Sequence, residues 1–188
     1  MSSSIGIYAS QISGHLVTNN YSSIQTVTVG SGGASSITFS SIPSTYTHLQ
    51  LRGISRSDAS GTNGVVIMYL NGVTTASGNY STHLLRGNGS SASAYGASGD
   101  VIQGVSPASS ASSNVFGASI WDILDYTNTN KNKVVRTLSG EDNNGDGIIQ
   151  LSSGMLYSSQ AAVTSITLVN NSSANFLQYS SFALYGVK

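Results

Sequence analysis

Residues 46–53 (YTHLQLRG) decide the fold class, because apolar and polar side chains alternate along this stretch. Its two leucines fall on one face of an extended strand, whereas the histidine, glutamine and arginine fall on the other face. This alternation is typical of a strand that buries one face in a core and leaves the other face in water.

The same period of two recurs along the chain, and clusters of Gly, Ser and Asn separate the alternating runs. The clearest further runs are 24–29 (IQTVTV), 36–39 (SITF), 163–169 (VTSITLV) and 176–187 (FLQYSSFALYGV). No segment has a convincing helical period, and we expect roughly eight to ten short strands. Many short strands with Gly-rich turns predict an all-β sandwich or barrel.

Two expected strands are apolar on both faces: 65–70 (VVIMYL) and 118–126 (ASIWDILDY). A strand in a sandwich with one core should have one wet face, so something must cover the second face. This cover comes either from another part of the same chain or from a subunit interface. In the second segment we predict Trp121 and Ile123 as contacts to another subunit or to a larger assembly.

Residues 1–22 lack a clear period and are interpreted as an extended N-terminal arm that precedes a single domain over 23–188. The arm contains apolar residues that we predict to dock on a neighbouring protein. These residues are Ile5, Ile7, Tyr8, Ile12, Leu16 and Val17. Neither a basic region nor a long apolar stretch occurs here, so we expect no signal peptide.

The composition is strongly polar but almost uncharged. Ser, Thr, Asn and Gln supply 75 of the 188 residues, whereas charged residues make up 7% and the net charge is zero. Clustered positive charge is needed to neutralise phosphates or to bind anionic lipid, so we expect no nucleic-acid and no membrane partner. The chain has no cysteine, which excludes disulfides, thiolate metal sites and cysteine nucleophiles.

The segment 142–147 (DNNGDG) matches the opening of a calcium loop, with oxygen ligands at positions 1, 3 and 5 and glycine at position 6. Position 12 is Ser153, where such a loop usually has a bidentate Glu. The flanking residues look like strands, and a tight hairpin prefers the same Asn, Asp and Gly. A hairpin is therefore the favoured interpretation, and a calcium site is the alternative.

Acid–base catalysis needs two carboxylates, or a carboxylate and a histidine, aimed at one point. Asp122 and Asp125 fall on opposite faces of the expected strand, so we predict a structural role for Asp122, paired with an arginine. The three histidines show no metal-ligand spacing, and no Gly-x-Ser-x-Gly elbow is present. The sequence therefore predicts no enzyme, no cofactor and no metal site.

Tyrosines in loops could serve a different purpose, since exposed aromatic rings beside Asn and Gln stack on sugars. Of the ten tyrosines, Tyr80, Tyr95 and Tyr157 lie in or near expected loops and should be the most exposed.

Several blocks of sequence resemble small β-rich virion proteins of tailed bacteriophages, especially phages of cyanobacteria and aquatic bacteria. The blocks are 36–53 (SITFSSIPSTYTHLQLRG), 79–92 (NYSTHLLRGNGSSA), 125–145 (DYTNTNKNKVVRTLSGEDNNG), 165–168 (SITL) and 178–188 (QYSSFALYGVK). They follow in the same order and cover the chain from about residue 35 to its end. The resemblance implies an antiparallel β-sandwich of jelly-roll type, often within a symmetric oligomer. It brings no catalytic motif.

We therefore expect a non-enzymatic structural protein of a virion, namely a capsid decoration or cement protein. Its expected partners are other virion proteins, first of all the major capsid protein, and further copies of itself in a homotrimer. A surface with few charges suits this task, because its interactions then depend little on the salt concentration. The alternative is a tail fibre or baseplate adhesin domain that binds a host-surface glycan.

Overall fold

The computed structural model describes residues 20–188 as an all-β fold of twelve strands in two antiparallel sheets. The strands are β1 (Tyr21–Thr28), β2 (Ser36–Phe39), β3 (His48–Ser55), β4 (Asn63–Leu70), β5 (Tyr80–Gly87), β6 (Ala92–Ser98), β7 (Ile102–Pro107), β8 (Gly117–Ile123), β9 (Lys133–Asp142), β10 (Gly147–Leu156), β11 (Ile166–Asn170) and β12 (Ser181–Val187). A short 3₁₀ turn, η1 (Asn171–Ser173), follows β11.

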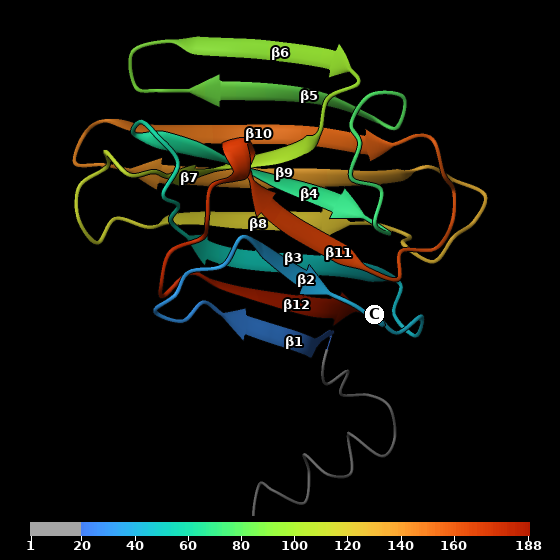
Figure 1. The fold of residues 1–188 in the computed structure, drawn as a ribbon. Helices are drawn as coiled ribbons and strands as arrows, with labels where there is room; N and C mark the ends of the chain where they lie inside the picture. The colour runs from blue at the N-terminus through green and yellow to red at the C-terminus, as the bar shows by residue number, and fades with distance from the viewer. Residues whose placement is uncertain (1–19) are drawn as a thin grey trace, which may run out of the picture.

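The two sheets stack face to face as a sandwich. The larger sheet has the strand order β1-β12-β3-β8-β9-β10-β5-β6, and the smaller has the order β2-β11-β4-β7. The chain crosses between the sheets from β2 to β3, from β3 to β4 and from β4 to β5, which is the path of a jelly roll. Figure 1 shows the small sheet in front of the middle of the large sheet, with β5 and β6 above it. The expected fold class is confirmed.

The structure contains more strands than the sequence patterns indicate, and β6 and β7 account for part of the difference. Their sequences, ASAYGAS and IQGVSP, are short of large apolar side chains and do not alternate. Hydrophobic periodicity does not identify such strands, because Ala, Ser and Gly also occur in turns. Strand β1 begins at Tyr21 and so includes the last two residues assigned to the arm.

Strand β7 approaches the large sheet closely because small residues face it. A Cβ atom at Gly104 would lie 2.9 Å from the Trp121 ring, so any larger residue would push the sheets apart. Two serine side chains of the large sheet bond the backbone of β7: Ser139 Oγ accepts from the Val105 N–H at 3.1 Å, and Ser152 Oγ donates to the Gln103 carbonyl at 2.6 Å. These bonds satisfy backbone groups of β7 at the edge of the small sheet.

The core lies between the sheets and includes Trp121 and Ile123, which are both fully buried. The prediction that these two residues contact a partner is therefore wrong for the folded domain, because the small sheet already covers them. The other face of β8 carries Ile120 and, just beyond the strand, Leu124, which are 40% and 57% exposed.

The other apolar segment lies in β4, where Val66, Met68 and Leu70 are buried in the core. Its second face is half-buried, and the Tyr69 ring packs 6.1 Å from the Tyr80 ring. Cover for this face thus comes largely from within the chain. Within residues 20–188, no helix has the length and apolar character needed to cross a membrane.

Candidate functional site

The outer face of the large sheet carries a continuous run of exposed aliphatic side chains. Cross-strand register places Ile120 opposite Leu138, Leu138 opposite Leu151, and Leu151 opposite Leu85, so one row crosses β8, β9, β10 and β5. Ile54 and Ile149 lie in the neighbouring row. We call these six residues the aliphatic stripe, and their exposed fractions range from 40% to 62%.

Each member of the aliphatic stripe follows from strand alternation. In β9 the inward positions are occupied by Lys133, Val135, Thr137 and Ser139, which leaves Leu138 pointing outward. Scattered exposed apolar residues are normal on a soluble protein, but a contiguous patch over four strands is not. Contiguous patches of this kind mark surfaces that bind other macromolecules.

A polar row borders the aliphatic stripe on the same face. Gln50 Nε2 donates to Asp122 Oδ1 at 2.8 Å, and an Arg136 N–H donates to Asp122 Oδ2 at 2.9 Å. Partial burial opposes ionisation of the Asp122 carboxyl, but the hydrogen bonds from Arg136 and Gln50 outweigh it and lower its pKa. The prediction that Asp122 pairs with an arginine is confirmed, and the partner is Arg136.

The polar border continues at β12 and β1. The Arg52 guanidinium lies 5.2 Å from the ring centres of both Tyr21 and Tyr185, and its Nε donates to Gln50 Oε1 at 2.7 Å. This stacking holds Arg52 against the aromatic rings. The aliphatic stripe is therefore a bounded patch, with a fixed polar rim on the side of β3 and β12.

The stripe opens into a groove of about 600 Å³ beside β5 and β6, where His83, Tyr95, Arg136 and Leu151 are among the lining residues. A Cβ atom at Gly96 would lie 2.4 Å from the His83 ring, so glycine leaves room for the imidazole against β6. Tyr95 is 50% exposed, as expected from the sequence. Tyr80 is fully buried instead, because its hydroxyl donates to the Val73 carbonyl inside the fold.

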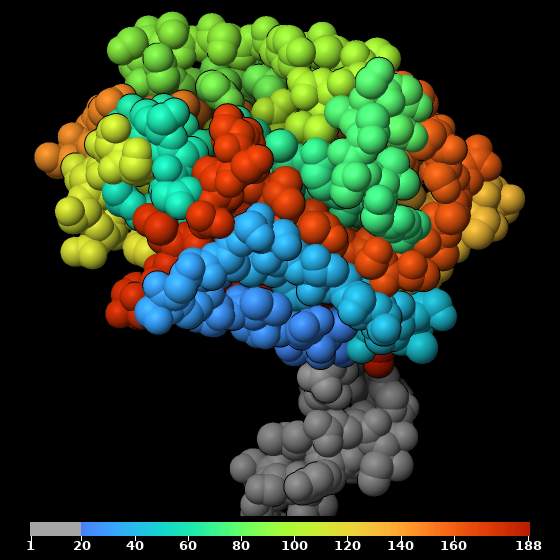
Figure 2. Space-filling view, viewed as in Figure 1, coloured from blue at the N-terminus to red at the C-terminus, as the bar shows by residue number. Residues whose placement is uncertain are grey.

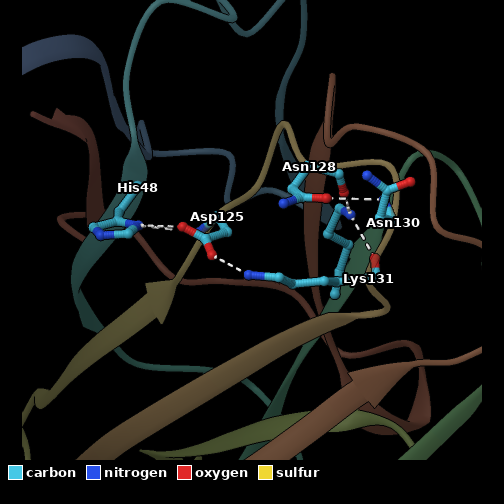
Figure 3. A network of polar contacts seen from close by, with 6 residues as sticks. His48, Asp125, Asn128, Asn130 and Lys131 are labelled. Carbon is cyan, nitrogen blue, oxygen red and sulfur yellow. Dashed lines mark hydrogen bonds and ion pairs between the residues drawn. The ribbon is translucent and has the colours of Figure 1, made fainter.

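A second polar cluster joins His48, Asp125 and Lys131 at one end of the sandwich (Figure 3). The His48 Nδ1 accepts the Asp125 N–H at 3.0 Å, and Lys131 Nζ donates to Asp125 Oδ2 at 2.7 Å. The contact with Lys131 lowers the pKa of the exposed Asp125 carboxyl. Asp125 has a left-handed backbone (φ 48°), so the cluster fixes the turn after β8.

Lys133 is a buried cation that the sequence patterns did not single out. Its Nζ donates to the carbonyl oxygens of Asn128, Lys131 and Gln160, the last two at 2.8 and 3.0 Å. Burial lowers the pKa of this ammonium group. With its three donors engaged by backbone carbonyls, Lys133 links two loops at the same end of the sandwich.

The segment 142–147 forms the turn of the β9–β10 hairpin, so the favoured interpretation is confirmed. The Gly145 N–H donates to Asp142 Oδ1 at 2.9 Å, and the Asn143 N–H donates to the Asp146 carbonyl at 2.8 Å. Over the described part of the chain, no three His, Asp or Glu side chains gather in a group that could hold a metal ion.

Glu141 lies at the base of this hairpin, and both of its carboxyl oxygens are buried without a hydrogen-bond partner. Burial, with repulsion from Asp146, raises its pKa to about 7, against the opposing effect of Arg56. Arg56 does not neutralise it, because the guanidinium donates to the carbonyls of Ala111, Ser112 and Val115.

The predicted contact residues of the N-terminal arm, namely Ile5, Ile7, Tyr8, Ile12, Leu16 and Val17, lie outside the described residues. Sequence reasoning missed the aliphatic stripe as a set, although the double-faced pattern of 118–126 signalled it. The pattern showed that both faces of the strand are apolar, but not which face is exposed to solvent. We find no match for the chain among protein-family models, curated proteins or solved structures.

Proposed function

We propose that this protein is a non-enzymatic structural component of a phage particle, a decoration or cement protein that binds the capsid shell. The observation that carries the proposal is the aliphatic stripe, a bounded apolar patch on a rigid sheet. The resemblance of the strand blocks to phage virion proteins supports the same conclusion, as does a surface nearly free of charge. The partner is the major capsid protein.

The mechanism is addition of buried apolar surface at the joints between capsid subunits. Each stripe side chain leaves water on docking, and the gain is about 25 cal/mol per Å² of apolar area. The polar row around Asp122 and Arg136 limits the patch and sets its orientation, since charged rims contribute to specificity more than to affinity. A sheet face suits this role because its backbone is already fixed by hydrogen bonds on both sides.

Cosedimentation with purified shells stripped of accessory proteins tests the proposal. The double variant Leu138→Asn/Leu151→Asn should bind shells at least about tenfold more weakly, as expected when central apolar anchors are lost. The matched control is Tyr179→Asn, which removes a 71% exposed side chain from a loop outside the stripe. Equal binding by the two variants, or no binding by the unmodified protein, would contradict the proposal.

A deletion of residues 1–17 tests the arm separately. We expect it to abolish shell binding while the sandwich stays folded, because β1 begins only at Tyr21. If the shortened protein binds shells with full affinity, the arm has no part in docking, and the stripe alone carries it.

A second candidate is an adhesin domain that binds a host-surface glycan. Tyr95 on β6 favours it, because half of this aromatic side chain is exposed to solvent. An exposed aromatic ring is a common platform on which a sugar stacks. A glycan array should then give hits that Tyr95→Ala abolishes, and an array without hits removes this candidate.

A further inference from the structure

Strand β6 ends the large sheet and is open on three sides. Six of its seven residues are exposed, and it lies beyond the small sheet, at the upper rim of the molecule in Figures 1 and 2. Its partner β5 covers one edge, while the other edge is free and most of both faces is exposed. An exposed edge strand with so little cover presents unpaired backbone groups to water, which favours a partner on its free edge.

The free edge of β6 carries unpaired backbone groups in a regular series. Gly99 N–H bonds the Tyr80 carbonyl at one end of the hairpin, and Asn88 N–H bonds the Ser91 carbonyl at the other. Because bonded and non-bonded pairs alternate in an antiparallel ladder, odd-numbered residues between them bond β5. The N–H and C=O groups of Ala94 and Gly96, like those of the other even-numbered residues, therefore point away from β5.

Nothing in β6 blocks another strand from adding to this edge. Natural edges are protected by charges, proline or bulges, and the sequence ASAYGAS has no charge and no proline. Its register with β5 runs without a shift from Ala92 to Ser98. The opposite edge differs, since β1 carries a register shift between Ser23 and Gln25.

We propose that β6 is a self-association edge, at which two copies of this chain pair antiparallel about a two-fold axis centred on Tyr95. The occupant is a second copy because the strand is complementary to itself. Reversed about Tyr95, it places Tyr95 opposite its own copy, Ala94 opposite Gly96 and Ser93 opposite Ala97, so only small, uncharged side chains flank the central tyrosine pair. The two large sheets then join into one, independently of any capsid.

Disulfide trapping tests this register in the full chain, which has no native cysteine. On the two-fold axis the two Tyr95 Cα atoms form a non-bonded pair about 4.5 Å apart, within disulfide range. Tyr95→Cys should therefore form a covalent dimer on mild oxidation. The matched control, Ser93→Cys, faces Ala97 of the other copy and should stay monomeric on a non-reducing gel. Equal crosslinking of both variants, or none of Tyr95→Cys, would overturn the proposal.

Light scattering across a concentration series gives a second, independent readout. We expect twice the chain mass of 19.3 kDa, and three times that mass, as expected for a trimer, would overturn the pairing. Ala94→Pro removes a donor from the free edge but no bond to β5, so it should return the protein to the single-chain mass while the sandwich stays folded. A dimer that survives Ala94→Pro, or that is lost on deletion of residues 1–19, would also overturn the proposal.

Discussion

Arg136 on β9 and Asp122 on β8 lie directly opposite each other, and an Arg136 N–H donates to Asp122 Oδ2 at 2.9 Å. Two residues further along these strands, on the same face, Leu138 lies opposite Ile120 in the aliphatic stripe. The ion pair and the apolar patch are thus adjacent rows of one sheet face. Burying either charge without the other is costly. The apolar surface of a docking partner must therefore end at this charged row.

Loss of the ion pair should have a small, pH-dependent effect on stability. The Asp122 pKa is lowered in the folded protein, so its contribution is present above the ordinary pKa of 3.8 and is lost as pH falls through the folded value. Asp122→Asn should lower the free energy of unfolding by up to about 1 kcal/mol at pH 7, since Arg136 is largely exposed. Chemical denaturation at pH 7 and pH 2 measures this, and an equal loss at both values would contradict it.

Glu141 should give the opposite pH dependence. Its folded pKa of about 7 is above the ordinary value of 4.5, so its contribution is complete below pH 4.5 and is lost as pH rises through 7. Glu141→Gln cannot ionise, and at pH 8 it should be more stable than the unmodified protein by on the order of 1–2 kcal/mol, after allowance for screening. Denaturation curves at pH 5 and pH 8 test this. A variant with the same pH dependence as the unmodified protein would show that Glu141 is not the group responsible.

The sequence predicted the sandwich because alternation in strands such as β3 is unambiguous: Leu49 and Leu51 are both fully buried. It failed where both faces of a strand are apolar. For Ile120 and Trp121, periodicity shows that the two side chains diverge, but only the position of the small sheet decides which is buried. The aliphatic stripe depends on cross-strand register, which no local pattern encodes.

Serine in the core is a further feature that local patterns cannot predict. Ser139 and Ser152 lie on the inner face of the large sheet and bond the backbone of β7, although serine usually indicates turns or surface. The close approach at Gly104 likewise depends on the position of Trp121, which is distant in sequence. Such contacts between sheets arise only once the strand order is known.

The close approach of β7 makes Gly104 intolerant of a side chain. Gly104→Ala would place a Cβ atom 2.9 Å from Trp121 Cζ2, and overpacking of this kind should cost about 1–3 kcal/mol. Gly32→Ala is the matched control, because nothing lies within 4 Å of its added Cβ. Thermal unfolding should therefore show a lower melting temperature for the first variant alone, and equal melting temperatures would contradict the close packing.

Tyr179 should be replaceable with a gain in stability. Its backbone is left-handed (φ 73°), its side chain is 71% exposed, and its N–H donates to the Val29 carbonyl at 3.0 Å. A residue with a Cβ in this conformation is strained by about 1–2 kcal/mol, and glycine is not. Tyr179→Gly should therefore raise the free energy of unfolding by about 0.5–1 kcal/mol, since glycine also gains entropy in the unfolded chain. Tyr179→Ala retains the strain and should give no gain, so equal gains in denaturant titrations would assign the effect to loss of the exposed ring instead of to the backbone.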